Sequence, residues 1–164
     1  MKRIFGLVFL SFIFFLPGCD DQRLNFIEAH KVTVIDGDTI LLDNKTWIRL
    51  SGLDAPELGQ KPFGIEARDR LEALIKSDLP LICFLTGKDT YFRFLAECVT
   101  NSQGLNVNSW LVVEGLALVN PNYPSPYKYE QTIARQLHLG VWSLTNPLQE
   151  APWEERRRLR YVTR

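Results

Sequence analysis

The chain has 164 residues, of which 46% are hydrophobic and 12% aromatic, so it can bury the core of one domain and disorder throughout is not expected. Lysine and arginine number 19, and aspartate and glutamate also number 19, so the formal net charge is zero. This balance argues against tight, non-catalytic DNA binding, because such binding relies on many basic groups that neutralise phosphates.

Residues 1–18 are predicted to form a signal peptide, because two basic residues precede an apolar run that is shorter than the about 20 residues of a membrane-spanning helix. The run ends in Leu16-Pro17-Gly18-Cys19, which resembles the lipobox of bacterial lipoproteins. We therefore expect an exported domain, anchored through lipidated Cys19 at the periplasmic face of the inner membrane. Because Pro17 is unusual in a lipobox, simple cleavage to a periplasmic or secreted protein stays open, as does an uncleaved anchor.

A short linker, residues 20–25, leads into one predicted domain, residues 26–147. The first three strands are predicted at residues 32–35, 39–42 and 47–50, where β-branched and apolar runs are separated by turn-forming residues. Residues 64–76 then show apolar side chains at spacings of three and four, which predicts a helix.

The second half of the predicted domain contains a hairpin and two short helices. The hairpin strands are expected at residues 81–85 and 94–99, and the helices at 107–114 and 129–139. This order predicts a mainly β, α+β fold: a five-stranded OB-fold barrel with about three helices. Residues 148–164 carry five arginines with little apolar patterning, so we expect a basic tail that is solvated or loosely helical.

Cys83 and Cys98 lie in the two predicted hairpin strands and could face each other. In an oxidising compartment they could form a disulfide, which would contribute about 3 kcal/mol in the chain-entropy model. Two buried thiols that pack as small apolar groups are an equally good interpretation.

Two acidic clusters suggest metal-assisted chemistry. Asp36-Gly37-Asp38 alone is typical of a hairpin turn, but a second cluster follows the third strand, where Ala55-Pro56 separates Asp54 from Glu57 and exposes the Ala55 carbonyl. Carboxylate and backbone oxygens are the ligands that calcium selects. Arg49 and Arg93 could hold a phosphodiester against such a cation.

Three ordered stretches, residues 34–40, 48–57 and 89–96, resemble the staphylococcal nuclease (thermonuclease) family, and residues 111–117 and 140–142 extend the resemblance over nearly the whole predicted domain. The resemblance implies an OB-type barrel that hydrolyses DNA and RNA with calcium. It also implies cleavage of the bond to the 5′ oxygen, which leaves 3′-phosphate products. We expect the protein to act as a monomer.

The resemblance also assigns roles to single positions. It implies that calcium is bound by Asp38 and Asp54 through their side chains and by Ala55 through its carbonyl, with Asp36 just behind these ligands. Arg49 and Arg93 match the two phosphate-binding arginines, and Glu57 matches the carboxylate beside the attacking water. The expected substrate contacts are Tyr91, on a phosphate, and Tyr123 and Tyr127, which lie where a ring stacks on the base; a surface tyrosine is the alternative for the last two.

Two positions before Arg93 depart from the family pattern, and one of them is Thr90, where the family often has a basic residue. Phe92 stands where the family usually has glycine before Arg93, and a bulky residue there could tilt Arg93 or crowd the nucleotide. The main functional alternative is a non-catalytic OB-fold module that binds single-stranded nucleic acid or a protein partner. The intact set of Arg49, Asp54, Glu57 and Arg93 argues against this alternative, and also against a purely structural calcium site.

Overall fold

The computed structural model describes residues 25–43 and 45–162. The predicted signal peptide, Cys19 and nearly all of the predicted linker lie outside this range. Within the described residues, no helix combines the length and the apolar character that crossing a membrane requires.

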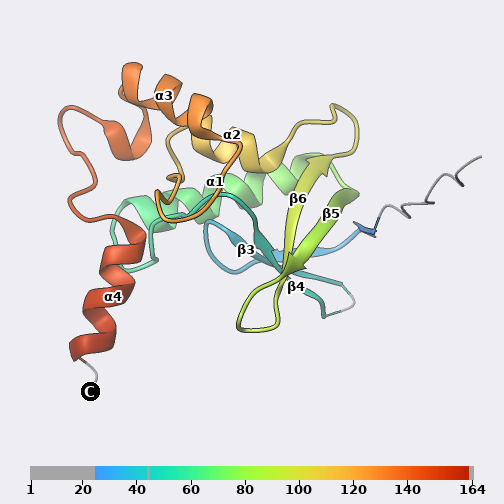
Figure 1. Cartoon of the computed structure of the whole chain (residues 1–164). Helices are drawn as coiled ribbons and strands as arrows, with labels where there is room; N and C mark the ends of the chain where they lie inside the picture. Colours follow the sequence, from blue (N-terminus) through green and yellow to red (C-terminus); the bar gives the residue numbers. More distant parts are fainter. Residues whose placement is uncertain (1–24, 44, 163–164) are drawn as a thin grey trace, which may run out of the picture.

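Among the residues that the structure describes, six strands form one curled sheet in the order β1-β5-β6-β4-β3-β2 (Figure 1). Their bounds are β1 Phe26–Ala29, β2 Val32–Val34, β3 Thr39–Leu42, β4 Trp47–Leu50, β5 Leu81–Lys88 and β6 Phe94–Thr100. Neighbouring strands are antiparallel except β4 and β6, which are parallel. In this register Thr39 pairs with Arg49 and Arg49 with Leu95, so residues from three strands meet at one level of the sheet.

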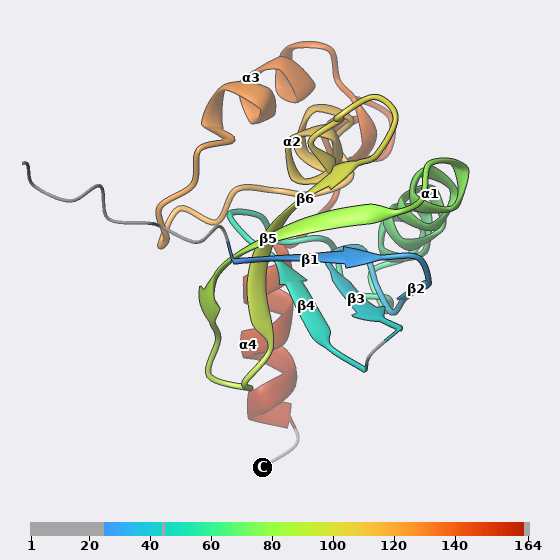
Figure 2. The ribbon, with the colours of Figure 1, turned by 90° about the vertical axis from the view of Figure 1, so that its right-hand side faces the viewer.

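In the described part of the chain, four α-helices and one 3-10 helix complete the fold. Their bounds are α1 Phe63–Ser77, α2 Val107–Val113, α3 Lys128–Gln136, η1 Gly140–Trp142 and α4 Pro152–Val162. Helices α1, α2 and α3 gather on one side of the curled sheet, whereas α4 extends away from them (Figures 1 and 2).

The core lies between the sheet and α1. Ile40 and Ile48 from the strands are fully buried, as are Ala67 and Leu71 of α1, with Ile75 nearly so. These helical residues are spaced by four, so they lie on one face of α1, as the apolar pattern of the sequence predicts.

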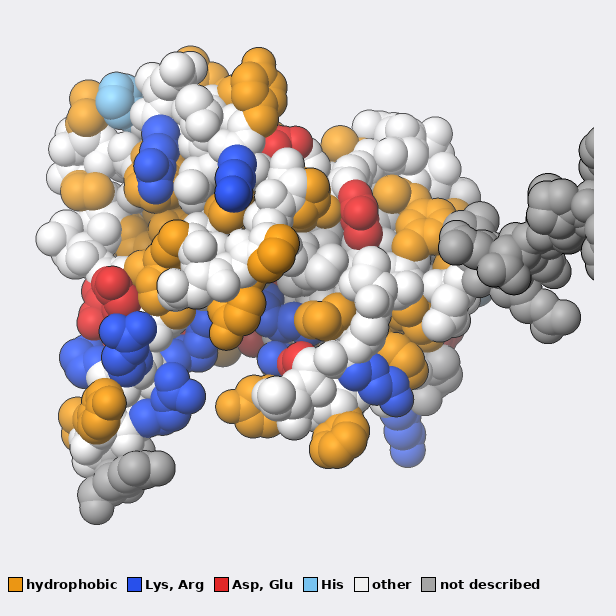
Figure 3. All heavy atoms as spheres, in the orientation of Figure 1, with side chains coloured by type: hydrophobic (Ala, Val, Ile, Leu, Met, Phe, Trp, Pro, Cys, Tyr) orange, Lys and Arg blue, Asp and Glu red, His pale blue; other side chains and the backbone are white. Residues whose placement is uncertain are grey.

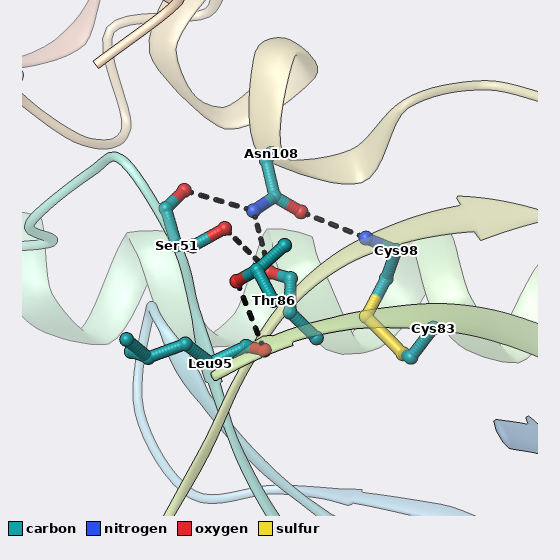
Figure 4. Close-up of a disulfide and its surroundings, with 7 residues drawn as sticks. Ser51, Cys83, Thr86, Leu95, Cys98 and Asn108 are labelled. Atoms are coloured by element: carbon teal, nitrogen blue, oxygen red, sulfur yellow. Dashed lines mark hydrogen bonds between the residues drawn. A yellow bond between two sulfur atoms is a disulfide. The ribbon is translucent and has the colours of Figure 1, made fainter. Parts of the chain in front are cut away.

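A buried polar side chain ties α2 to the sheet (Figure 4). Asn108 accepts a hydrogen bond from the backbone N–H of Cys98 at 3.1 Å and donates to the carbonyls of Ser51 and Ala96, both at 3.0 Å. Beside it, Cys83 and Cys98 pair directly across β5 and β6 and are joined in a disulfide. Because Asn108 is fully buried, these bonds fix the position of α2.

The α+β fold class with a curled, OB-like sheet is confirmed, but the expected number of five strands is wrong. The additional strand is β1, Phe26–Ala29, which pairs with the outer edge of β5. It has only four residues, of which two are exposed, so its sequence carries little strand signal and its pairing with β5 defines it. The structure also has one more α-helix than expected, α4.

Candidate active site

A cleft of about 970 Å³ opens between the sheet, the β5–β6 hairpin and α4. Figure 3 shows a hollow beside α4 with lysine and arginine side chains gathered around it. The predicted site residues that line the cleft are Asp36, Asp38, Arg49, Asp54, Glu57, Tyr91, Arg93 and Tyr123. The fold therefore brings two acidic clusters and two arginines, far apart in sequence, to one place.

Asp38 and Asp54 meet at one guanidinium group. Asp38 immediately precedes β3, and Asp54 follows β4, where it bridges to Leu118. Arg49 on β4 forms ion pairs with both carboxylates, whose side chains are only 9% and 8% exposed. The two carboxylates are thus close enough to share one cationic group.

Further hydrogen bonds fix the Asp38 carboxylate. One of its oxygens accepts from the backbone N–H of Ala55 at 2.7 Å, and the other from the hydroxyl of Thr39 at 3.2 Å. Asp36 accepts from the backbone N–H of Asp38 at 3.0 Å, so it shapes the turn that carries Asp38. Burial raises the pKa of Asp38 above its ordinary value, against the lowering effect of Arg49.

Asn120 is a site residue that the sequence did not reveal. Its side-chain amide donates to Asp54 at 3.0 Å, and it is buried and lines the cleft. No motif marks this asparagine, which lies in the loop between α2 and α3 and reaches Asp54 only through the tertiary fold.

Arg93 is held by its own hairpin. One oxygen of Asp89 accepts from the backbone N–H groups of Tyr91 and Arg93, and the other accepts from Nε of Arg93 at 2.7 Å. Burial raises the pKa of Asp89, but the bonds from Arg93 and Tyr91 outweigh it and the net pKa is lowered. The far end of Arg93 reaches the hydroxyl of Thr39 at 3.3 Å, beside Asp38.

Phe92 adopts the left-handed backbone conformation that the family's glycine would favour, with φ of +63°. Its side chain is 84% exposed, and Arg93 keeps its ion pair with Asp89. The bulky residue therefore places strain in the turn and leaves Arg93 facing the cleft.

The predicted tyrosines separate into two groups. Tyr91 and Tyr123 are 74% and 69% exposed and line the cleft. Tyr127 is 4% exposed and packs under Gly52, where burial raises its pKa. The expectation of a base-stacking ring is therefore wrong for Tyr127, since a ring that is enclosed by protein cannot stack on a nucleotide.

Glu57 is contacted by the C-terminal segment. Arg156 of α4 places Nη1 2.6 Å from Oε1 of Glu57 and Nη2 3.0 Å from Oδ1 of Asp54. Burial alone would lower the pKa of Arg156, but the two carboxylates raise it overall. In addition, Gln60 accepts from the backbone N–H of Glu57 and donates to the carbonyl of Glu150.

The C-terminal segment is a helix that packs against the domain, whereas the sequence predicts a solvated or loosely helical tail. Trp153 packs against the cluster of Phe63, Leu118 and Val141, and Glu155 is buried and paired with Arg158. The sequence carries only a weak indication of this helix. Pro152 opens it and two glutamates occupy its first turn, which is typical of a helix start. The five arginines of residues 148–164 favour the interpretation as a solvated tail.

The carboxylate oxygens of Asp38 and Asp54 are donors that suit a hard cation. Among residues 25–43 and 45–162, no group of three or more His, Cys, Asp or Glu side chains is placed to hold a metal ion. The two carboxylates of Asp38 and Asp54, which meet at Arg49, are the acidic oxygens that a metal here would find side by side. An all-oxygen set of this kind fits calcium, which readily accepts carbonyl and water ligands.

Comparisons with known proteins point to one family. The family described as "Staphylococcal nuclease homologue" matches residues 47–144. The chain is 35% identical over 150 residues to a micrococcal nuclease of Shigella flexneri, covering 80% of this chain and 82% of that protein. It is 32% identical over 127 residues to a thermonuclease of Staphylococcus hyicus, covering 68% and 73%.

Other relatives are longer proteins. A probable staphylococcal-like nuclease of rice, Oryza sativa subsp. japonica, is 34% identical over 147 residues, which are 88% of this chain and 28% of that protein. The chain thus spans less than a third of this relative. Since the family match covers more than half of the chain and includes the stretch from Arg49 to Arg93, the chain belongs to the staphylococcal nuclease family.

Proposed function

We propose that this protein is a calcium-dependent nuclease that hydrolyses phosphodiester bonds of DNA, RNA or both. The observation that carries the proposal is the meeting of Asp38 and Asp54 at one guanidinium, with Glu57 in the same cleft. The relatives named as nucleases support it.

Calcium would be held by the carboxylates of Asp38 and Asp54 and the carbonyl of Ala55. When bound, the ion supplies positive charge that neutralises the attacked phosphate. Asp36 supports the site by accepting from the backbone of Asp38, which orients the first ligand.

Two arginines would grip the phosphate. Arg93 extends from the hairpin toward Thr39, and Arg49 lies on β4 in the position that pairs with Thr39. A guanidinium has five N–H donors, so Arg49 can contact a phosphate while it still pairs with carboxylates. Both groups can strengthen their hydrogen bonds as charge builds on the phosphate oxygens in the transition state.

Glu57 would orient a water molecule and accept its proton. The water oxygen bonds to phosphorus, the bond from phosphorus to the 5′ oxygen breaks, and the departing oxygen takes up a proton. The products are a 3′-phosphate and a 5′-hydroxyl. Tyr91 and Tyr123, exposed at the cleft, would contact the phosphate and the base of the bound nucleotide.

The cellular location is part of the proposal. We infer that the domain is exported and tethered through Cys19. The Cys83–Cys98 disulfide supports export, because disulfides persist mainly in oxidising compartments. Labelling cells with radioactive palmitate tests the tether: the wild type should take up label and Cys19→Ala should not. Equal labelling of both would contradict it.

One assay decides between enzyme and binder. The domain without its first 19 residues is incubated with single-stranded DNA and with RNA, in calcium and in excess chelator. We expect digestion in calcium alone, with 3′-phosphate ends. Binding of either polymer without digestion would favour the non-catalytic OB-fold module instead.

A further inference from the structure

Helix α4 forms one wall of the cleft. Arg156, Leu159 and Arg160 line it, opposite Lys88 and Tyr91 of the β5–β6 hairpin. Figure 3 shows the hollow between these two walls, and Figure 1 shows α4 and the hairpin extending in the same general direction. The cleft therefore continues beyond Asp38 and Asp54 along the exposed face of α4.

The two arginines on this face have different surroundings. Arg156 is held by Asp54 and Glu57, and it joins α4 to the carboxylates of the cleft. Arg160 lies one turn further along the same face, about 6 Å along the helix axis, and is exposed. Within residues 25–43 and 45–162, no ion pair involves Arg160. Its charge is thus available to a ligand in the cleft.

The helix is anchored firmly enough to hold such a charge in place. Trp153 packs on the apolar cluster of Phe63, Leu118 and Val141, and Gln60 connects the carbonyl of Glu150 to the backbone N–H of Glu57. Arg158 pairs with Glu150 and Glu155, so it stabilises the helix start and does not face the cleft.

We propose that α4 is a phosphate-binding wall of the substrate cleft. Arg160 contacts the backbone phosphate next to the attacked one. Arg156 is a positioning residue that fixes α4 and Glu57. The occupant is a single strand of DNA or RNA, because a flexible, repeating polyanion matches a cationic side chain beside an open cleft lined with exposed aromatic rings. This proposal rests on the proposed function, since it assumes that the attacked phosphate lies near Asp38 and Asp54.

The test measures binding of a fluorescent single-stranded oligonucleotide to the full-length protein in chelator, as a function of salt. Loss of one phosphate contact should reduce the magnitude of the slope of log affinity against log salt by about 0.7. At about 0.15 M salt the same loss corresponds to roughly fourfold weaker binding for Arg160→Gln. The matched control is Arg157→Gln, a neighbouring exposed arginine that does not line the cleft, and it should bind as the wild type does.

A second measurement uses substrates of two lengths in calcium. Arg160→Gln should lower kcat/KM for a long strand by a similar factor and leave kcat/KM for a dinucleotide unchanged, because a dinucleotide has no flanking phosphate. The proposal is overturned if the Arg160 and Arg157 variants behave equally in both measurements. It is also overturned if Arg160→Gln cleaves faster than the wild type, because α4 would then obstruct the cleft.

The two proposals fail in distinguishable ways. If the wild type digests nucleic acid but the salt slope does not depend on Arg160, the phosphate-binding role of α4 is refuted and the proposed nuclease activity is retained. If the slope depends on Arg160 but calcium brings no digestion, α4 binds nucleic acid and the catalytic proposal is refuted.

Discussion

Nη1 of Arg156 lies 2.6 Å from Oε1 of Glu57, although 99 residues separate the two in the chain. The same guanidinium also contacts Asp54 at 3.0 Å. The C-terminal helix is therefore part of the site and holds the carboxylate that we propose accepts the proton from water.

Replacing Arg156 should reduce turnover. In Arg156→Gln, Glu57 loses the group that orients it, so kcat for a dinucleotide should fall about 10- to 100-fold with KM nearly unchanged. Arg156→Lys keeps the charge and should recover part of the loss. Steady-state kinetics at saturating calcium measure both values, and a kcat for Arg156→Gln equal to that of the wild type would contradict the positioning role.

Replacing Glu57 should remove catalysis and keep the fold. Glu57→Gln retains the shape of the side chain but cannot accept a proton, so turnover should fall by about 10²- to 10⁴-fold. Oligonucleotide binding and Tm should stay near the wild-type values. Glu66→Gln, which changes an exposed glutamate of α1 outside the cleft, is the matched control. If the two variants cleave equally fast, Glu57 has no catalytic role.

Replacing Phe92 should stabilise the protein. Phe92 has φ of +63° and is 84% exposed, so its side chain brings backbone strain and little burial. Phe92→Gly should raise the free energy of unfolding by about 0.5–1 kcal/mol, measured by urea denaturation. Phe92→Ala keeps the Cβ atom that causes the strain and should show no such gain. Equal gains in both variants would point to loss of the exposed ring as the cause.

Removing the disulfide should destabilise the domain. The bond between Cys83 and Cys98 closes a loop with a sequence separation of 15, for which the chain-entropy model gives about 3 kcal/mol. The double variant Cys83→Ala, Cys98→Ala should unfold in urea with a free energy lower by about that amount. The wild type measured in reductant serves as the comparison, and an unchanged stability in both would show that the bond contributes nothing.

Asp78 should make stability depend on pH. Hydrogen bonds from the backbone N–H and hydroxyl of Ser102 lower the pKa of Asp78. Because the folded pKa lies below the unfolded value of about 3.9, the stabilisation is complete above that value and is lost as pH falls through the folded pKa. Asp78→Ala should therefore be less stable than the wild type in urea at pH 7, with a smaller difference at pH 3. A difference that does not change with pH would exclude this linkage.

Local sequence determined much of the fold. The spacing of Ala67, Leu71 and Ile75 predicted α1, because a helix brings residues four apart onto one face. The turns at Asp36-Gly37-Asp38 and at Ala55-Pro56 marked the ends of strands and placed acidic residues there. The sequence does not reveal the short strand β1, because its four residues depend on pairing with β5 for their conformation.

What the sequence by itself determined is the family: carboxylates and arginines follow one another in the order of the staphylococcal nucleases. Only the tertiary structure decided that Tyr127 is buried, that Asn120 reaches Asp54 and that Arg156 holds Glu57. The physical reason is that burial and ion pairing depend on where the segments that follow β6 pack against the sheet. A run of arginines has the same local pattern whether it faces water or closes a cleft.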